Sequence, residues 1–291
     1  MTKAQPGNRV LLALESTLIA HCLPYPQNLE AVRALEALAR AHGVEPRTIA
    51  IQSGQIKVGL GDAELASLAQ SKGVAKVSSR DLAVVVAKRQ TGATTVSATT
   101  WLAHRAGIQI MATGGIGGVH RGGLPDISAD LPGLASTPVA IVCAGAKAIL
   151  DLPATLEWLE THRVPALGYQ TDEFPAFYSR SSGLPVQARV DSAEEAACVI
   201  KTHWELGFTS GLLICVPIPR DDEIPREVVE PAIGQALRES EAQRIRGGAV
   251  TPFVLARLAE LTEGATVRAN LALIKNNVVV AAQIAKALVQ L

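Results

Sequence analysis

The stretch VCAGAKAILDLPATLEWLE (residues 142–160) has the pattern of a strand, a tight corner and a helix. Apolar residues lead into a corner of small residues, and Pro153 close behind Asp151 predicts a helix with Asp151 as its N-cap. Lys147 stands in the corner, near a helix start whose unpaired N–H groups disfavour a cation. Two interpretations stay open: a neutral, nucleophilic amine, or an ordinary lysine that reaches solvent.

The same order of strand and helix recurs along the chain. Further strands are predicted at residues 9–16, 108–112, 138–143, 165–169, 186–190 and 211–216, and a hairpin at 47–60 turns at Ser53–Gly54. Helices are predicted at residues 28–43, capped by Asn28, and at 62–71, 80–89, 94–106, 193–206, 225–245, 252–263 and 267–290. This alternation indicates an α/β fold with a mainly parallel sheet. We expect one domain over residues 1–291, with residues 1–8 disordered.

The composition excludes several classes of protein. Of the 291 residues, 48% are hydrophobic, which is enough for a large core, and 27 basic residues balance 27 acidic ones, which argues against nucleic acid as a partner. The four cysteines lack the spacing of a zinc site or a disulfide framework. No long uninterrupted apolar run indicates a signal peptide or a membrane span, so we expect a cytoplasmic protein without a membrane partner.

Glu15 is the first candidate for chemistry, because it follows an apolar strand in LALEST (residues 12–17). A carboxylate delivered at the end of a buried strand is well placed to act as a general acid or base. The alternative is a carboxylate that only caps a turn or pairs with an arginine.

Lys76 precedes Ser78 and Ser79, which can cap a following helix. A lysine beside the N–H groups of a helix start is suited to bind phosphate. A surface lysine before a helix cap is also common, so the pattern alone leaves both interpretations open.

A glycine-rich loop lies in MATGGIGGVHRGGLPDISAD (residues 111–130), so the backbone there turns sharply or approaches another group closely. The spacing does not fit a dinucleotide site, because His120 stands where the third glycine would be. Asp126, Ser128 and Asp130 alternate, and an extended segment would place these oxygen-bearing side chains on one side. They are candidate ligands for Mg²⁺ or Mn²⁺, or alternatively a solvated acidic loop.

Several longer segments together resemble one family. They are ALESTLIAHCLPYPQN, KVSSRDLA, GATTVSAT, ATGGIGGVHRG, DISADL, CAGAKAILDLPATLEWLET, TDEFPAFYS, TPFVLARLAELT and ANLALIKNN, in order from about residue 9 to the C-terminus. The chain is similar to the pseudouridine-5′-phosphate glycosidases, also called the indigoidine synthase A-like family. The resemblance implies an α/β/α fold, a homotrimer, and reversible cleavage of the C–C glycosidic bond of pseudouridine 5′-phosphate to uracil and ribose 5-phosphate.

The resemblance also implies roles for individual residues. Lys147 would form an imine with C1′ of the ring-opened sugar, Glu15 would be the general acid/base, and Asp126 would bind Mn²⁺, with Mg²⁺ or another divalent cation as an alternative. The residues matching substrate-binding positions are Lys76, Thr95, Val96, His120, Ser128, Ala129, Asp130 and Asn270.

Three positions depart from the family pattern, and two other functions stay open. Cys22 replaces a usual glycine, Ser79 a usual arginine and Val216 a usual asparagine, so affinity or substrate choice could differ. The alternatives are another Schiff-base lyase or aldolase acting on a sugar phosphate, and a regulatory protein that binds a sugar phosphate without turnover.

Overall fold

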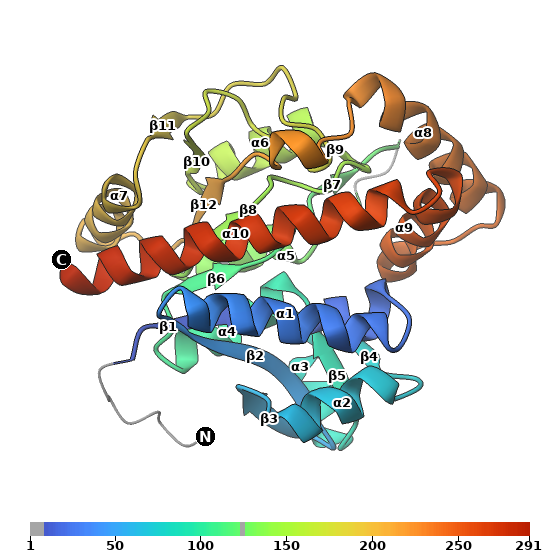
Figure 1. Cartoon of the computed structure of the whole chain (residues 1–291), viewed down its shortest axis with the longest axis horizontal. Helices are drawn as coiled ribbons and strands as arrows, with labels where there is room; N and C mark the ends of the chain where they lie inside the picture. The colour runs from blue at the N-terminus through green and yellow to red at the C-terminus, as the bar shows by residue number, and fades with distance from the viewer. Residues whose placement is uncertain (1–8, 123–125) are drawn as a thin grey trace.

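The computed structural model describes residues 9–122 and 126–291, so the predicted disorder of residues 1–8 lies outside the described residues. A ten-stranded sheet has the order β11-β10-β12-β8-β6-β1-β2-β5-β4, with β3 paired to β2 (Figure 1). Its strands are β1 (Leu11–Leu14), β2 (Glu45–Gln52), β3 (Gln55–Val58), β4 (Ala75–Val77), β5 (Gly92–Thr94), β6 (Ile110–Ala112), β8 (Ala140–Cys143), β10 (Ala166–Tyr169), β11 (Ala188–Val190) and β12 (Leu212–Cys215). A separate two-stranded ribbon joins β7 (Val119–His120) to β9 (Leu150–Asp151).

The sheet is mainly parallel, as the sequence predicts. Among the described pairings of this ten-stranded sheet, β2–β3 and β2–β5 are antiparallel and the others are parallel. The predicted hairpin turns at Ser53 and Gly54, which both have positive φ angles, as its tight two-residue turn requires. The central strands β1, β6, β8 and β12 are buried almost throughout, which explains their unbroken apolar sequences.

Successive strands are added to the sheet in opposite directions from the neighbouring strands β1 and β6. From β1 the chain moves to β2 on one side, whereas from β6 it moves to β8 on the other side, and β1 and β6 are themselves neighbours. In a parallel sheet the loops after two such strands separate and leave a crevice at the strands' carboxyl ends. Glu15 follows β1 and Thr113 follows β6, so both lie at this point.

Helices cover the sheet in two layers. One layer contains α1 (Gln27–Ala41), α7 (Ala193–Glu205) and α10 (Ala265–Gln290), and Figure 1 shows α1 and α10 side by side across the front. Right-handed crossovers from β6 to β8 and from β8 to β10 place α5 (Asp130–Ser136) and α6 (Leu152–Thr161) on the opposite face, and α4 (Val96–Arg105) packs against α5. The remaining α-helices are α2 (Asp62–Gln70), α3 (Leu82–Ala87), α8 (Arg226–Ala242) and α9 (Val250–Leu261).

Helix α10 is long and apolar enough, by length and composition, to span a membrane. An 18-residue window in it has a mean hydropathy of 1.3, and 56% of this window is buried inside the protein. The helix packs against α1, α7 and strands β6 and β8. Burial in the core is therefore a sufficient reason for its apolar composition.

The predicted role of Asn28 as a helix cap is wrong. Helix α1 starts at Gln27, so Asn28 lies inside it and is 3% exposed. Its Nδ2 donates hydrogen bonds to the carbonyls of Ile19 (2.7 Å) and Ala69 (3.0 Å). The amide thus joins α1 to α2 and to η1, a short π-helical turn (Leu18–Cys22) that follows β1.

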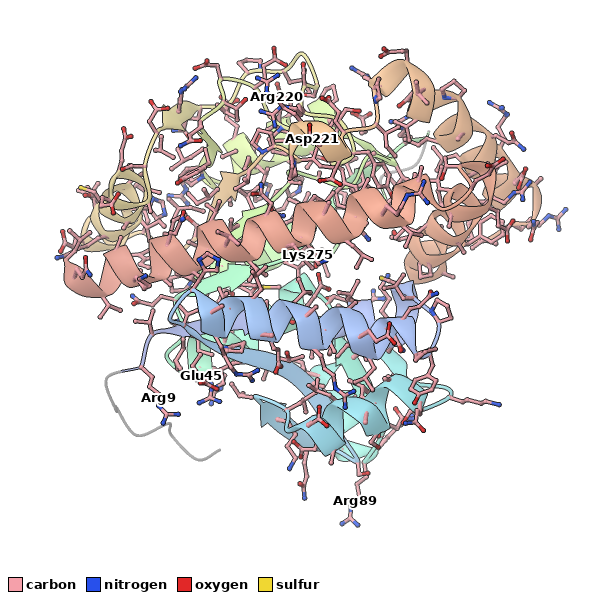
Figure 2. All side chains as sticks on the ribbon, in the orientation of Figure 1. Arg9, Glu45, Arg89, Arg220, Asp221 and Lys275 are labelled. Atoms are coloured by element: carbon pink, nitrogen blue, oxygen red, sulfur yellow. The ribbon has the colours of Figure 1, made fainter. Side chains whose placement is uncertain are left out.

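Charged residues such as Arg89 and Lys275 are exposed on the surface (Figure 2). Lys147 differs from them because it is half-buried at the carboxyl end of the sheet.

Candidate active site

Glu15 lies directly after β1, and two threonine hydroxyls hold its carboxylate. Thr17 Oγ1 donates a hydrogen bond to Glu15 Oε2, and Thr113 Oγ1 donates one to Oε1. Thr17 follows β1, whereas Thr113 follows the neighbouring strand β6. The carboxylate is therefore fixed from both sides of the crevice. It does not pair with an arginine in the part of the chain that the structure describes.

Lys147 stands in the predicted tight corner after β8. The corner needs glycine at residue 145, because Gly145 has a φ of +77° and a Cβ there would lie 2.4 Å from the carbonyl oxygen of Pro175. Ile116 N–H donates to the carbonyl of Gly145 at 3.0 Å, and Lys147 N–H donates to that of Ile116 at 3.1 Å. These two hydrogen bonds join the corner that contains Lys147 to the glycine-rich loop. Asp151 caps α6, as predicted, by accepting from the N–H of Ala154 at 2.9 Å.

One cavity brings together four of the predicted site residues. Glu15, Lys76, Lys147 and Asn270 all line this cavity, whose volume is about 60 Å³. They come from the ends of β1 and β8, from β4, and from α10. The remaining wall residues are Thr17, Leu18, His21, Cys22, Thr113, Gly114, Gly115, Phe177, Thr251, Pro252, Leu255 and Ile274. The cavity thus brings the amine of Lys147, the carboxylate of Glu15 and the amine of Lys76 together in one mostly apolar enclosure.

The two lysines of the cavity lie close enough for their charges to interact. The pKa of Lys76 is lowered, first because the side chain is desolvated and second because Lys147 lies near it; the carboxylates of Asp130 and Glu15 act in the opposite direction. Lys76 Nζ donates a hydrogen bond to the carbonyl of Gly248 at 3.0 Å. Since this acceptor is neutral, the ammonium group keeps its charge available for an anionic ligand.

His120 and Asp126 lie beside the cavity rather than in its wall. Desolvation is the main cause of a lowered pKa at His120; the charge of Asp126 raises it, and the charges of Lys76 and Lys147 lower it. His120 N–H donates to the backbone carbonyl of Asp126 at 2.8 Å. His120 is therefore within electrostatic reach of the two lysines and of Asp126.

Thr95, Val96 and the Ser128–Asp130 segment do not line this cavity, but a buried carboxylate joins the two segments to each other. Thr95 precedes α4, which begins at Val96. The carboxylate of Asp130 accepts hydrogen bonds from the N–H groups of Ser97 (2.9 Å) and Gly117 (2.8 Å), and the residue is 5% exposed. Asp130 thereby fastens the start of α4 to the glycine-rich loop.

The expectation of an extended segment through residues 126–130 is wrong at its end, because helix α5 begins at Asp130. Ser128 and Asp130 still face a common point, since a Cβ on Gly117 would meet both side chains within 3 Å. Asp126, by contrast, is exposed. The three oxygen-bearing side chains therefore do not form a row, and the Asp130 carboxylate is already occupied by backbone N–H groups.

The described residues contain no group of three or more His, Cys, Asp or Glu side chains that could hold a metal ion. A single exposed carboxylate at Asp126 is nevertheless compatible with Mg²⁺ or Mn²⁺, because Mg²⁺ keeps several waters and binds through one or two carboxylates together with substrate phosphate. The donor set thus fits a water-rich divalent cation and not a cage made only of protein ligands.

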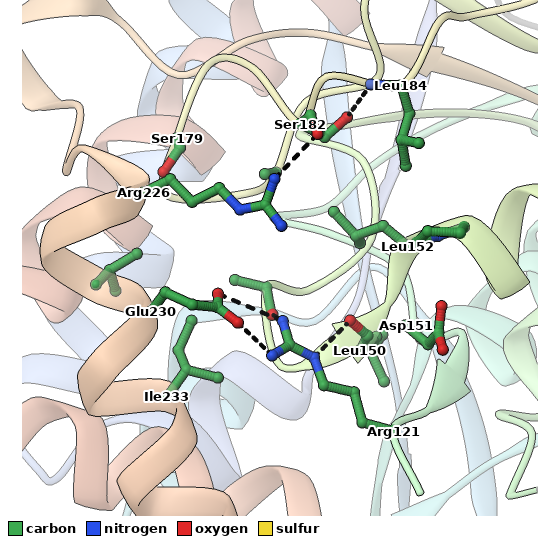
Figure 3. Close-up of a pocket in the computed structure, with 14 residues that line it drawn as sticks. Arg121, Leu150, Asp151, Leu152, Ser179, Ser182, Leu184, Arg226, Glu230 and Ile233 are labelled. Atoms are coloured by element: carbon green, nitrogen blue, oxygen red, sulfur yellow. Dashed lines mark hydrogen bonds and ion pairs between the residues drawn. The ribbon is translucent and has the colours of Figure 1, made fainter.

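A larger cavity, of about 410 Å³, is lined by Leu150, Arg121 and Glu230 (Figure 3). Its arginines are already engaged: Arg121 pairs with Glu230 and donates to the carbonyls of Ala148 (2.8 Å) and Leu150 (3.1 Å). Arg226 donates to the carbonyl of Ser182 at 3.1 Å. None of the predicted site residues lines this cavity. Size alone therefore does not identify the active site.

The two hydroxyls that hold the Glu15 carboxylate are not predicted by the sequence. Thr17 and Thr113 lie in the motif segments but were not singled out, because the signal is the adjacency of β1 and β6, which the sequence does not contain. Phe177, which has a φ of +62° and is 2% exposed, packs its ring where Cβ atoms on Gly114 and Gly115 would lie.

The three residues that depart from the family pattern lie in different parts of the fold. Cys22 lines the catalytic cavity, and its pKa is raised to about 11, first by desolvation and second by Glu15, so the thiol is protonated and is not a nucleophile. Ser79 N–H donates to Ser97 Oγ at 3.2 Å, near the start of α4. Val216 is 3% exposed and lies in the core.

Solved structures with the same fold support the architecture. An indigoidine synthase A-like protein from Thermotoga maritima is 38% identical, with a TM-score of 0.88, and the match covers 94% of this chain and 91% of that one. The prealnumycin C-glycosynthase AlnA, solved in complex with ribulose 5-phosphate, is also 38% identical, with a TM-score of 0.88 and coverage of 96% and 92%.

Curated relatives match along nearly the full chain. A protein named pseudouridine-5′-phosphate glycosidase from Caldanaerobacter subterraneus subsp. tengcongensis is 55% identical over 279 residues, which are 95% of this chain and 91% of the relative. A protein of the same name from Solibacter usitatus is 53% identical over 285 residues, covering 97% and 95%. The family described as indigoidine synthase A like protein matches residues 1–287. The chain therefore belongs to the indigoidine synthase A-like family.

Proposed function

We propose that the protein cleaves, and in reverse forms, the C–C glycosidic bond of pseudouridine 5′-phosphate. The observation that carries the proposal is the shared cavity of Lys147 and Glu15, with Lys76 at its edge. The names of the relatives that are about 50% identical support the same substrate. A C-glycoside lacks the leaving-group heteroatom on which ordinary glycoside hydrolysis by two carboxylates depends, so an amine is required to accept electrons at C1′.

Lys147 acts as the nucleophile. In the direction of synthesis, its neutral amine attacks C1′ of ring-opened ribose 5-phosphate, and loss of one water leaves an imine. C5 of uracil then attacks C1′, which forms the C–C bond and returns the imine electron pair to nitrogen. The sugar 4-hydroxyl oxygen displaces the amine and closes the ring, and its proton passes to the departing nitrogen. Cleavage is the reverse and consumes one water.

Glu15 moves the proton at uracil C5. It removes this proton after the C–C bond has formed, which restores the conjugated pyrimidine, and it donates the proton back in cleavage. The hydroxyls of Thr17 and Thr113 hold the carboxylate in the cavity for this transfer.

The phosphate group binds at the positive edge of the cavity. Lys76 supplies the charge, and the N-terminus of α4 at Thr95 and Val96 supplies N–H groups and a favourable helix dipole. His120, the Ser128–Asp130 segment and Asn270 complete the substrate enclosure. A divalent cation held by Asp126 would neutralise phosphate charge when it is bound.

Incubation of the purified protein with ribose 5-phosphate, uracil and Mn²⁺ tests the proposal, with mass spectrometry to detect a C-nucleotide. Consumption of ribose 5-phosphate that depends on uracil separates this function from that of another Schiff-base lyase or aldolase. Binding of ribose 5-phosphate without turnover would favour the regulatory alternative.

The likeness to a C-glycosynthase supports a second candidate, the transfer of the same sugar phosphate to a different carbon nucleophile. The same assay with other carbon-nucleophile acceptors in place of uracil distinguishes the two. We also propose a homotrimer, supported by the high hydrophobic fraction and the family resemblance. Light scattering should report about three chains per particle, and a monomer at micromolar concentration would contradict this.

A further inference from the structure

Among the described residues, the carboxylate of Glu15 is the only hydrogen-bond acceptor for the hydroxyls of Thr17 and Thr113. Thr17 Oγ1 and Thr113 Oγ1 each donate to one oxygen of the carboxylate, and all three residues line the catalytic cavity. Other buried threonines differ: Thr100 Oγ1 donates to the carbonyl of Val96 in its own helix at 2.6 Å, whereas Thr48 Oγ1 donates to the carboxylate of Glu36 at 2.6 Å. The hydroxyls of Thr17 and Thr113 therefore serve the carboxylate and not the local backbone.

The backbone of Thr113 is itself fixed on both sides. Its N–H donates to the carbonyl of Val142 in β8 at 3.1 Å. Its carbonyl accepts a hydrogen bond from Asn277 Nδ2 at 2.8 Å, and the same amide reaches the carbonyl of Gly114 at 3.3 Å. These hydrogen bonds fix the Thr113 backbone, and with it the point from which the hydroxyl projects towards Glu15.

Asn277 is fully buried on α10, and its Oδ1 has no hydrogen-bond partner within the described residues. Burying an amide with an unsatisfied acceptor is costly, and an apolar side chain would avoid this cost. The presence of an asparagine at residue 277 is explained if its Nδ2 group is needed to fix the turn at Thr113 and Gly114.

We propose that Thr113 and Thr17 are positioning residues that aim the Glu15 carboxylate at the reacting carbon, and that Asn277 positions Thr113 from helix α10. The inference rests on the proposed role of Glu15 as the general acid/base. A carboxylate with both oxygens held cannot rotate out of the line of proton transfer, whereas loss of one donor frees it to do so.

The kinetic test compares Thr113→Val, which keeps the shape and removes the hydroxyl, with Thr113→Ser, which keeps the donor. Thr113→Val should lower kcat for C–C cleavage by roughly 10–100-fold, the range for one hydrogen bond to a charged group, while KM stays unchanged. The borohydride-trapped adduct on Lys147 should still form, Thr113→Ser should keep most of kcat, and the matched control Thr100→Val should act as wild type. A Thr113→Val protein with wild-type kcat, or with kcat and adduct lost together, would overturn the inference.

A spectroscopic test does not depend on turnover. The ¹³C NMR signal of the Glu15 carboxyl carbon, assigned with Glu15→Gln, should change its chemical shift in Thr113→Val at constant pH, because one carboxylate oxygen has lost its hydrogen-bond donor. Asn277→Ala should change the chemical shift of the same carboxyl carbon in the same direction, provided that the variant unfolds at a temperature near that of wild type. If Asn277→Ala does not fold, the result for Thr113→Val alone tests the inference. An unmoved signal in Thr113→Val overturns the inference. Failure of the wild-type protein to form a C-nucleotide overturns the proposed function instead.

Discussion

Lys76 Nζ donates a hydrogen bond of 3.0 Å to the carbonyl oxygen of Gly248, a residue 172 positions later in the chain. Gly248 belongs to η4, a short turn (Gly247–Ala249) that leads into α9, and Thr251, Pro252 and Leu255 of α9 line the catalytic cavity. A lysine ammonium has three N–H donors, so Lys76 can bind a phosphate while it keeps this bond to the carbonyl of Gly248. The contact therefore links substrate binding to the position of α9.

Replacement of Lys76 should weaken substrate binding more than chemistry. Lys76→Met should raise KM for ribose 5-phosphate by roughly 10–100-fold, equivalent to about 1.5–3 kcal/mol for a hydrogen bond to a charged group. Lys72→Met, which removes an exposed lysine near the same strand, is the matched control and should leave KM unchanged. Steady-state kinetics at saturating uracil provide the measurement, and an unchanged KM in Lys76→Met would remove Lys76 from the phosphate site.

The lowered pKa of Lys76 gives the binding step a pH dependence. A lysine carries its charge below its pKa, so a lowered value means that phosphate affinity declines at a lower pH than it would with an ordinary lysine. The pH dependence of kcat/KM reports the ionisation of groups in the free enzyme, so the kcat/KM of wild type should decrease at alkaline pH. Lys76→Arg should shift this decline to higher pH, because the guanidinium stays protonated. An identical alkaline limb in both proteins would assign the titration to another group.

Removal of divalent metal should abolish turnover. Chelation followed by added Mn²⁺ should restore it, and Asp126→Asn should require a higher Mn²⁺ concentration because a neutral amide is a weaker ligand for a hard cation. Asp221→Asn, which alters an exposed carboxylate outside the cavity, serves as the control. Full activity after exhaustive chelation, with the metal content measured, would contradict the proposal.

The corner that holds Lys147 should not tolerate a side chain at Gly145. Gly145→Ala introduces a Cβ about 2.4 Å from the carbonyl oxygen of Pro175 at a positive φ, so both strain and a backbone clash result. Gly73→Ala is matched, because Gly73 has a φ of +68° with no atom within 4 Å of the added Cβ. Urea unfolding should show a loss of about 1 kcal/mol for Gly73→Ala and clearly more for Gly145→Ala. Equal losses would show that the corner can relax.

The sequence predicts features that depend on local pattern. The strand before Lys147, the cap at Asp151 and the helix that follows lie within a few residues of one another, and the structure confirms each of them. The Ser53–Gly54 hairpin is confirmed for the same reason, since its turn chemistry is local.

Features that depend on distant partners were missed or wrongly predicted. Asn28 is a good cap by residue type, but the carbonyls of Ile19 and Ala69 bind its amide inside α1. The hydrogen bond from Thr113 to Glu15 joins residues 98 positions apart. It requires β1 and β6 to be neighbours, and this strand order is a property of the whole sheet.

The division of labour between Lys147 and Glu15 is the central claim, and borohydride trapping with ribose 5-phosphate tests it most directly. Wild type and Glu15→Gln should both carry a stable secondary-amine adduct on Lys147 by peptide mass spectrometry. Glu15→Gln should nevertheless lose C–C cleavage by roughly 10²–10⁴-fold, because an amide cannot exchange the proton at uracil C5. Lys147→Ala and Lys147→Arg should show neither adduct nor activity, since neither side chain supplies a neutral amine. An adduct that maps to Lys76 or to any other lysine, or a Lys147→Ala protein that still turns over, would contradict the account.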